Sequence, residues 1–482
     1  MRISSFKAPN TYLLIFSILL MTAGLTWIIP SGHYQPDTIY RYRVNLDKNG
    51  TILDSVISDS FQVVKSNSYQ RLPSNPQGIW AVLQAPIQGF ADRNAAMIIG
   101  FILIIGGVFS VLQKTNTIDS GINTILKAYQ RSPLIQKSII PVFMLIFSLG
   151  GATFGMSEEV IPFILIFVPL AKRLGYDAMV GIAIPFVGAG AGFAGAFMNP
   201  FTIGIAQQIA GLPLFSGMGY RLISWAVCTG ISILFVASYA SKQKKRTRFT
   251  SDHRDHTQEK SDLINPGQVI SRKHRIILAL FLSGIGIMVI GVLRYQWYIE
   301  QICAIFLLMG ILIGVVGRMS PGEFTSSFIS GAGEMVGTAM VIAISKGILI
   351  IAQQGMIIDT VLNFFSGLIT GLHPIVTSQA MFIVHTIINF FIPSGSAKAA
   401  LTMPIMIPLS DLLDLSRQIA VLAYQYGDGF TNMIIPTSPV TMGVLSCAGV
   451  SWKDWARWLL PLQLIYLIIG FVMLIPPYFF NW

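Results

Sequence analysis

The stretch GGVFSVLQKTNTIDSGIN, residues 106–123, has a counterpart 240 residues further along the chain, KGILIIAQQGMIIDTVLN at residues 346–363. The matching pairs are Gly107/Gly347, Gln113/Gln353, Ile118/Ile358, Asp119/Asp359 and Asn123/Asn363. An offset of 239 then aligns Ser157/Ser396, Pro169/Pro408, Gly188/Gly427, Gly190/Gly429, Pro200/Pro439 and Gly204/Gly443. Most of these positions are Gly, Pro or polar residues within very apolar sequence. Apolar chains that are duplicated internally and interrupted by paired Gly and Pro residues are typical of secondary transporters.

The composition is that of a membrane protein. Hydrophobic residues make up 53% of the 482 residues and charged residues only 11%, and many apolar runs reach the roughly 20 residues that a spanning helix needs. The net charge of +11 comes from basic residues in loops between apolar runs, a pattern of membrane topology rather than of nucleic-acid binding. The first span, 11–30, is too long for a removable signal peptide and lacks its small-residue cleavage pattern.

No motif indicates an enzyme or a pump driven by ATP. The sequence has no phosphate-binding loop, hydrolase triad or metal cluster, and Cys228, Cys303 and Cys447 are spaced for neither a metal site nor a disulfide framework. We therefore expect no catalytic residue, no metal site and no cofactor, apart from coupling to Na⁺ or H⁺. We also expect no nucleic-acid partner.

Basic residues in loops predict the orientation of the chain in the membrane. The most basic loop contains SKQKKRTR and SRKHR between residues 240 and 275, so we place it in the cytoplasm. The N terminus is then cytoplasmic, and both the polar stretch 32–77 and the C terminus are external. In the first half, the predicted elements are a span at 11–30, an interfacial helix at 78–92, a span at 95–113, a hairpin at 138–171 entered from the cytoplasm, a broken helix at 176–210 and a span at 219–239.

The second half repeats this order upside down after one extra span. Its predicted elements are a span at 298–317, an interfacial segment at 320–333, a span at 335–352, an external loop at 353–373, a hairpin at 374–411 entered from outside, a broken helix at 417–448 and a span at 458–477. The domain organisation is therefore a first inverted repeat at 1–239, a cytoplasmic linker at 240–274, an extra span at 275–297 and a second inverted repeat at 298–482. The predicted fold class is an all-α polytopic membrane protein with two re-entrant hairpins and two broken helices.

A plain bundle of eleven or more full spans is the alternative, with each hairpin arm counted as a crossing. It would expose GGATFGMSEE (150–159) and YGDGFTNM (426–433) to lipid. Irregular backbone at membrane depth is stable only where it is buried in protein or lines a wet cavity. This requirement favours the hairpins, and the hairpin plan also disfavours a channel.

Three segments resemble the C4-dicarboxylate anaerobic carrier family, and the likeness covers nearly the whole chain. They are IPSGSAKAALTMPIMIPLSDLL (392–413), AYQYGDGFTNMIIPTS (423–438) and GAGAGFAGAFMNPFTIGIAQ (188–207). Within the family, the chain looks most similar to the YfcC-like branch, which is assigned as basic amino acid (arginine/ornithine) antiporters. The order of elements is similar to that of elevator-type carriers of the ion transporter superfamily. The resemblance implies a homodimer, in which a domain of both hairpins and both broken helices moves against a fixed scaffold.

The hairpin tips are the first candidates for a binding site. A break in a helix exposes free backbone N–H groups at one helix start and free C=O groups at another helix end, and positive N-termini attract carboxylates. Ser394 and Ser396, on either side of Gly395, can cap the second arm of the outer hairpin, and Thr153 and Ser157 can cap that of the inner hairpin. For any single hydroxyl, capping alone explains the residue as well as substrate binding does.

Charges at the tips are more informative. Glu158 and Glu159 fall in the first turn of a helix, where the helix dipole favours carboxylates, so capping explains at least one of them. Lys398 also lies at a helix start, where a cation is disfavoured, and ionisable residues within the membrane usually have a function. The offset of 239 places Glu159 and Lys398 at equivalent positions on the two tips. We expect a site for a zwitterion between them, and a buried salt bridge between the two is the alternative.

The broken helices supply further candidates. Asp428 lies between glycines in YGDGFTN, which we expect to be unwound, and it can bind Na⁺, carry a proton, meet a cationic substrate or cap the next segment. Asn432 and, on the other broken helix, Asn199 are expected to contact the substrate. Lys346, inside the span 335–352, either reaches the outer interface, or its ammonium replaces a bound cation or pairs with Asp428. The candidate Na⁺ ligands, chosen for their oxygen atoms, are Thr153, Asn199, Thr202, Asp428 and Thr437.

The sequence thus predicts a secondary active transporter of basic amino acids in the cell (inner) membrane. It would work by arginine/ornithine-type exchange or by ion-coupled uptake, with elevator-type alternating access. One alternative is an Na⁺- or H⁺-coupled transporter of C4-dicarboxylates. The other, from a different class, is an intramembrane enzyme or receptor that uses the same cavity.

Overall fold

The computed structural model describes residues 11–46, 52–65, 67–251, 271–295, 297–369, 372–480 and 482. The elements of the first half are α1 (Thr11–Ile28), β1 (Gly32–His33), β2 (Pro36–Leu46), β3 (Ile52–Val64), β4 (Gln70–Arg71), α2 (Ile79–Ala91), α3 (Arg93–Lys114), α4 (Thr117–Arg131), α5 (Pro133–Phe154), the short turn η1 (Glu158–Val160), α6 (Ile161–Arg173), α7 (Ala178–Ala194), the π-helical turn η2 (Pro200–Gly204), α8 (Ile205–Ile209) and α9 (Met218–Ser251). Two helical hairpin arms, α5 and α6, therefore occupy the range predicted for the inner hairpin.

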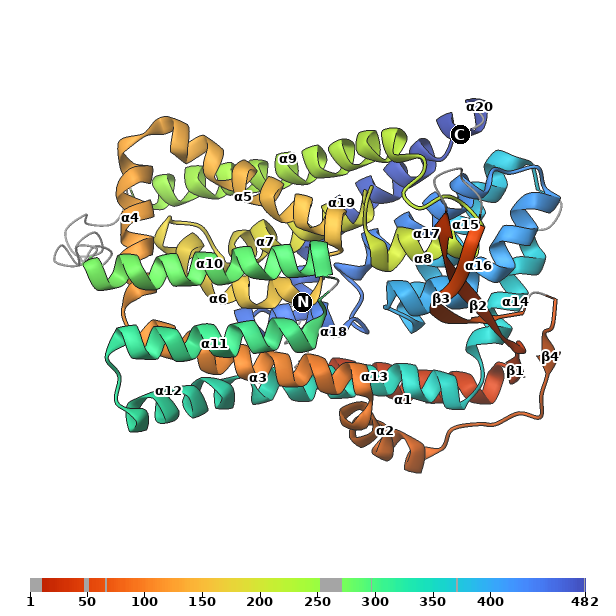
Figure 1. Cartoon of the computed structure of the whole chain (residues 1–482), viewed down its shortest axis with the longest axis horizontal. Helices are drawn as coiled ribbons and strands as arrows, with labels where there is room; N and C mark the ends of the chain where they lie inside the picture. The colour runs from red at the N-terminus through yellow and green to blue at the C-terminus, as the bar shows by residue number, and fades with distance from the viewer. Residues whose placement is uncertain are drawn as a thin grey trace, which may run out of the picture.

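The second half is also built from helices in the described residues. Its elements are α10 (Arg272–Tyr295), α11 (Ile299–Gly317), α12 (Pro321–Glu334), α13 (Val336–Gln354), α14 (Ile358–Ile369), α15 (Pro374–Phe391), α16 (Gly395–Leu412), α17 (Arg417–Asn432), α18 (Pro439–Ala448), α19 (Trp452–Met473) and α20 (Pro476–Phe479). The long helices run along the longest dimension of the molecule (Figure 1). The β-strands and α14 lie at one end, and α4 and α12 lie at the other (Figure 1).

The two halves pack across each other. Hairpin arm α5 packs on α7 and α15 packs on α17, but η2 and α8 contact α16 of the second half, and α18 contacts α6 of the first. In the same way, α2 packs along α13 and α12 packs along α3. Glycines allow these close approaches: a Cβ on Gly89 would lie 2.0 Å from the carbonyl oxygen of Ala343, and one on Gly331 would lie 2.2 Å from that of Gly106.

The polar stretch 32–77 is not a plain loop, and the chain is not wholly α-helical. Strands β2 and β3 pair antiparallel, and β1 pairs with β4. Threonine, isoleucine, tyrosine and valine occur close together in TIYRYRV (38–44), and these residue types favour a pleated strand. The prediction of an all-α chain was therefore wrong for this stretch.

Other segments also differ from the prediction. The predicted external loop 353–373 contains α14, and the unassigned segment between residues 114 and 137 contains α4. The apolar residues of both helices recur with helical spacing. The predicted linker 240–274 overlaps the end of α9 and the start of α10, and its residues 252–270 lie outside the described residues. The predicted interfacial segment 320–333 forms α12, which packs lengthwise on α3 and continues into α13.

The two broken helices are interrupted within the predicted segments GAGAGFAGAFMNPFT (188–202) and YGDGFTNMIIPTS (426–438), but only in the later part of each segment. Helix α7 continues to Ala194 and the break occupies 195–199, while α17 continues to Asn432 and the break occupies 433–438. The glycines serve close packing instead of unwinding, since a Cβ on Gly429 would lie 2.3 Å from Cα of Ala194. Asp428 therefore lies in a regular helical turn, and the prediction that it is unwound was wrong.

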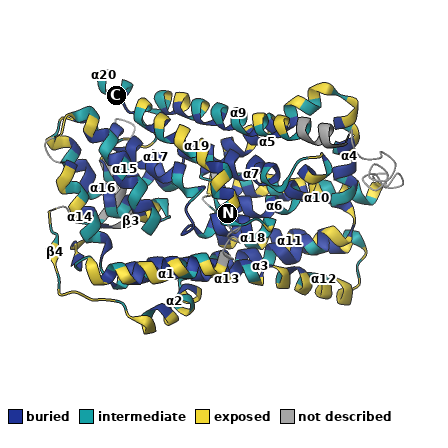
Figure 2. Ribbon diagram, turned by 180° about the vertical axis from the view of Figure 1, so that it is seen from behind, coloured by how far each residue is buried: buried dark blue, intermediate teal, exposed yellow. Residues whose placement is uncertain are grey.

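Apolar side chains cover the outside of the helical body. Among the described residues, 8 helices are long and apolar enough to cross a membrane. Exposed residues such as Leu234 on α9 and Ile290 on α10 face outward, and Figure 2 shows exposed positions along the outer helices around a buried interior. An apolar exterior on long helices is stable in lipid rather than in water.

We expect Gly192→Ala to destabilise the protein, because the added Cβ would lie 1.9 Å from the backbone oxygen of Ser148 and would push α7 away from α5. The expected loss is about 1–3 kcal/mol, as for other overpacked interiors. Thermal unfolding in detergent, followed by tryptophan fluorescence, measures it. Gly230→Ala in α9 is the matched control, since nothing lies within 4 Å of its Cβ position. Equal stability of the two variants would contradict the prediction.

Candidate functional site

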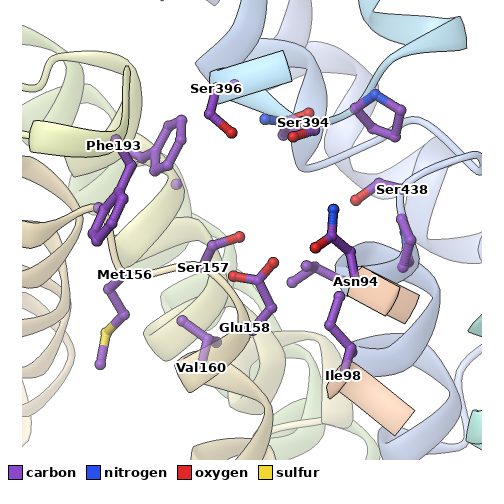
Figure 3. A pocket seen from close by; sticks show the side chains of 18 of the residues that line it. Asn94, Ile98, Met156, Ser157, Glu158, Val160, Phe193, Ser394, Ser396 and Ser438 are labelled. Carbon is purple, nitrogen blue, oxygen red and sulfur yellow. The ribbon is translucent and has the colours of Figure 1, made fainter. Parts of the chain in front are cut away.

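A cavity of about 420 Å³ lies between the tips of the two hairpins. Its lining comes from the inner tip (155–160), the outer tip (393–396), the residues after α17, and helices α3, α7 and α13. Figure 3 shows the side chains of Ser157 and Glu158 on one side of this space and those of Ser394 and Ser396 on another. The predicted site segments of both halves therefore meet at one place.

The inner tip forms where α5 ends at Gly155. This residue has φ +73, a left-handed conformation that glycine adopts without strain, and a Cβ on it would lie 2.6 Å from Oδ1 of Asn199. The turn η1 then leads into α6. Ser157, Glu158 and Glu159 line the cavity, so the tip presents two adjacent carboxyl groups to it.

The two carboxylates have different positions. The backbone N–H of Ser157 donates to Oε2 of Glu159 at 3.0 Å, so this buried carboxylate folds back on the tip. Glu158 is half-buried and points into the cavity (Figure 3). None of the ion pairs formed by the described residues includes either carboxylate. Charges with little access to water are stable when paired, so these two acids favour a cationic ligand.

The hydroxyls that we expected to cap the second arms make no capping bond. Ser394 is at the N-cap of α16 and Ser157 at that of η1, and neither side chain accepts a capping N–H. Both side chains line the cavity instead. Ser396 is exposed in the first turn of α16, and the Thr153 hydroxyl donates to the carbonyl oxygen of Leu149 within α5. Capping was therefore the wrong explanation for all four hydroxyls, and Thr153 does not line the cavity.

Gly395 lets the outer tip touch both broken helices. A Cβ at this position would lie 2.5 Å from Cγ2 of Thr202 and 3.1 Å from Oδ2 of Asp428, so no larger residue fits without displacing one of them. The hydroxyl of Tyr424 donates to the carbonyl oxygen of Gly395 at 2.6 Å. These contacts fix the outer tip against η2 and α17.

Lys398 pairs with Asp428 and not with Glu159. Its Nζ is 2.8 Å from Oδ1 of Asp428, and both side chains are 0% exposed; Nζ also donates to Oδ1 of Asn389 at 2.9 Å. Neither Lys398 nor Asp428 lines the cavity, whereas Asn432 does, and its Nδ2 donates to Oδ2 of Asp428 at 3.2 Å. The alternative of a salt bridge between Glu159 and Lys398 was therefore wrong, and of these two residues only Glu159 lines the cavity. The Lys398 side chain therefore contacts α17 through Asp428.

Polar atoms near the breaks of both broken helices are left without partners. The hydroxyl oxygens of Thr202 and Thr437 and Nδ2 of Asn199 are buried and have no hydrogen-bond partner in the described part of the chain. Thr202 and Thr437 line the cavity, but Asn199 does not. Oδ1 of Asn199 instead accepts the backbone N–H two residues further on, at 2.9 Å. Thr202 and Thr437 thus each place an unpaired hydroxyl oxygen at the cavity, and their role as Na⁺ ligands stays a prediction.

One wall of the cavity was missed by the sequence reasoning. Lys346 of α13 and Asn94 of α3 line it, and Nζ of Lys346 is 3.2 Å from Oδ1 of Asp92. The expected pairing of Lys346 with Asp428 was wrong, because Lys398 occupies that carboxylate. The available signal was Asp92 itself, an acid at the end of the predicted interfacial helix 78–92 that had no assigned partner.

The chain matches the family described as DcuC, C4-dicarboxylate anaerobic carrier, over residues 8–478. It is 33% identical over 475 residues to "Putative basic amino acid antiporter YfcC" of Escherichia coli (strain K12). This alignment covers 93% of this chain and 92% of the relative. It is 28% identical over 499 residues to an uncharacterised protein of Haemophilus influenzae (strain ATCC 51907 / DSM 11121 / KW20 / Rd), covering 98% of this chain and 97% of that protein.

Two solved transporter structures are distantly similar. The YdaH transporter of Alcanivorax borkumensis is 16% identical with a TM-score of 0.42, and the comparison covers 98% of this chain and 99% of that one. MtrF of Neisseria gonorrhoeae is 16% identical with a TM-score of 0.41, covering 97% and 95% of the two chains.

Proposed function

Because the chain belongs to the C4-dicarboxylate anaerobic carrier family, we propose that it is a secondary active transporter of basic amino acids. The family and the named relative are transporters and not enzymes, as the sequence predicts. The chain is a multi-pass membrane protein, and its substrate is a small molecule. The name of the Escherichia coli relative supports the choice of a basic amino acid.

The charge of the cavity carries the proposal. Its lining contains two carboxylates, Glu158 and Glu159, and one ammonium, Lys346. An arginine-like substrate has two cationic ends and one carboxylate, which is the complementary set. A C4-dicarboxylate would instead bring two negative charges toward two acids and a single lysine. Electrostatic complementarity of this kind determines which ligand is accepted.

The packing supports the elevator mechanism and the inverted repeat. The break of each broken helix packs on the hairpin of the other half, η2 and α8 on α16 and α18 on α6. A body made of both hairpins and both broken helices would therefore move as a unit. The remaining long helices, among them α1, α3, α11 and α13, would form the scaffold, and two scaffolds would join in a homodimer in the inner membrane, with the N terminus cytoplasmic and the C terminus external.

The same site is compatible with two forms of coupling. Exchange of one cationic amino acid for another requires no ion, because each substrate neutralises Glu158 and Glu159 in turn. Coupled uptake would use Na⁺ or H⁺, and the free hydroxyl oxygens of Thr202 and Thr437 supply ligands of the type that Na⁺ prefers. Transport that is independent of Na⁺ and of a pH gradient supports exchange.

Counterflow into proteoliposomes tests the proposed substrate. Vesicles loaded with arginine should accumulate labelled arginine and ornithine and should leave labelled succinate outside. The test is repeated with and without Na⁺, and empty vesicles are the control for leakage. Counterflow of succinate without counterflow of arginine would replace this proposal with the C4-dicarboxylate transporter. Absence of flux for every solute would favour a receptor or enzyme.

A further inference from the structure

The wall formed by α3 and α13 carries an ion pair whose cation faces the cavity. Lys346 lines the cavity, and its Nζ is 3.2 Å from Oδ1 of Asp92. The two side chains are 16% and 28% exposed, so a ligand can reach them. Among the described residues that line the cavity, Lys346 is the single basic one.

This wall is held rigidly. A Cβ on Gly89 of α2 would lie 2.0 Å from the carbonyl oxygen of Ala343, and one on Gly347 would lie 3.1 Å from Ala85. The backbones of α2 and α13 are therefore in direct contact on both sides of Lys346. Since a preorganised charge loses little entropy when a ligand binds, a lysine on this wall is suited to ligand recognition.

Asp92 is hydrogen-bonded even without Lys346. Its Oδ1 accepts the backbone N–H of Ala95 at 3.0 Å, which caps the start of α3. The Asp92 oxygen that contacts Lys346 therefore also accepts the amide N–H of Ala95. The lysine can move away without leaving the carboxylate unpaired. Beside Lys346, the hydroxyl of Ser345 lines the cavity and is buried with no hydrogen-bond partner among the described residues. A ligand with acceptor oxygens would satisfy both groups.

We propose that Lys346 receives the carboxylate of the substrate, with Ser345 beside it, and that Asp92 holds the lysine while the site is empty. This inference rests on the proposed transport of basic amino acids, in which Glu158 and Glu159 receive the cationic groups. The Lys346 wall then distinguishes an amino acid from the corresponding amine, which has the same cationic end but no carboxylate. Lys398 cannot take this role, because it is fully buried and paired with Asp428.

Arginine and agmatine, its decarboxylated form, are the matched ligands for the test. Calorimetric titration of the purified protein should show tighter binding of arginine. In Lys346→Met, the affinity for arginine should fall about ten- to a hundredfold, as expected for one charge-assisted contact, while the affinity for agmatine should change by less than about threefold. Lys346→Arg should keep the preference for arginine. Asp92→Asn retains an acceptor for the α3 cap and removes the competing charge, so the ratio of arginine to agmatine affinity should rise.

The control for loss of one positive charge is Lys137→Gln. Lys137 is exposed near the start of α5 and does not line the cavity. Agmatine binding by Lys346→Met shows that this variant is folded. If Lys346→Met does not fold, Lys346→Gln replaces it in the test. An equal loss of arginine and agmatine affinity, or no loss of either, would overturn the role of Lys346.

A failure of the proposed function gives a different result. Binding of succinate without arginine in the unmodified protein would reject the basic amino acid, and Lys346→Met should then weaken succinate by about tenfold or more if the lysine receives a carboxylate. If Lys346→Met binds succinate as tightly as the unmodified protein does, the role of Lys346 is overturned as well. Binding of none of the three ligands to the unmodified protein would overturn both.

Discussion

Replacing Lys398 by methionine should lower the free energy of unfolding by about 3–5 kcal/mol, because it leaves the fully buried carboxylate of Asp428 without its cation. The two side chains form a 2.8 Å ion pair with no exposure, and Asn389 contacts the lysine and α17 together. Asp428→Leu should lower the free energy of unfolding by a similar amount, because it leaves the buried ammonium of Lys398 without its carboxylate. Equilibrium unfolding in mixed micelles measures both losses.

The double variant Lys398→Met/Asp428→Leu separates the ion pair from simple packing. Removing both charges should recover most of the lost stability, because apolar replacements of a buried pair are often neutral or stabilising. The double variant should nevertheless transport poorly, since Asn432 of the cavity then loses the carboxylate that it contacts. Losses that simply add in the double variant would show that the pair is not coupled. Exchanging the charges of Glu159 and Lys398 should not restore the stability that the single changes remove, because these two residues do not form an ion pair.

Replacing Glu158 or Glu159 by glutamine should each weaken arginine binding about ten- to a hundredfold, the effect of losing one charge-assisted hydrogen bond. Both carboxylates line the cavity and neither forms an ion pair within the described residues. Glu158 should have the larger effect on arginine, because Glu159 already accepts the backbone N–H of Ser157. Calorimetric titration with arginine measures both affinities.

Titration with succinate gives the opposite expectation for the same variants. Removing a negative charge from the cavity should leave succinate binding unchanged or improve it. Glu334→Gln, an exposed acid at the end of α12 and away from the cavity, is the matched control and should alter neither ligand. Full arginine affinity in both Glu158→Gln and Glu159→Gln would show that the cationic end binds elsewhere.

The sequence predicts the order of helices well because that order depends on local properties. Apolar length, Gly and Pro interruptions and basic loop ends were enough to place the arms of both hairpins, α5–α6 and α15–α16. The strands β2 and β3 were missed, since a polar segment outside the apolar runs was treated as a loop although its residue types favour strands. The breaks were predicted too long because a glycine in a helix indicates either unwinding or close packing, and only the neighbouring helix decides between them.

Side-chain partners were predicted poorly, because the repeat gives equivalent positions but not partners. Asp119 and Asn123 on α4 match Asp359 and Asn363 on α14, and each pair accepts hydrogen bonds. Arg173 of α6 donates to the first pair. In the second pair, the backbone N–H of Tyr34 donates to Asp359 and its hydroxyl donates to Asn363. The acceptors were visible as a repeat, whereas their donors come from unrelated parts of the chain.

The same limit explains the charged residues of the site. An offset of 239 aligns the two tips in sequence, but it does not give the rotation of each tip about its helix axis. Lys398 faces α17, whereas Glu158 faces the cavity. Lys346 and Asp92 belong to different halves and are not equivalent under the repeat, so no internal comparison could have paired them.

The packing of α6 against α18 limits when the protein can fold during its synthesis. Helix α6 ends at Arg173 and α18 begins at Pro439, so the ribosome must add more than half of the chain before the two helices can meet. At about 5–20 residues per second, this interval lasts on the order of 15–50 s. Throughout it, the inner hairpin lacks a partner for one of its faces. The first half must therefore remain in the membrane with incomplete packing, protected by lipid or by insertion factors, until its counterpart emerges.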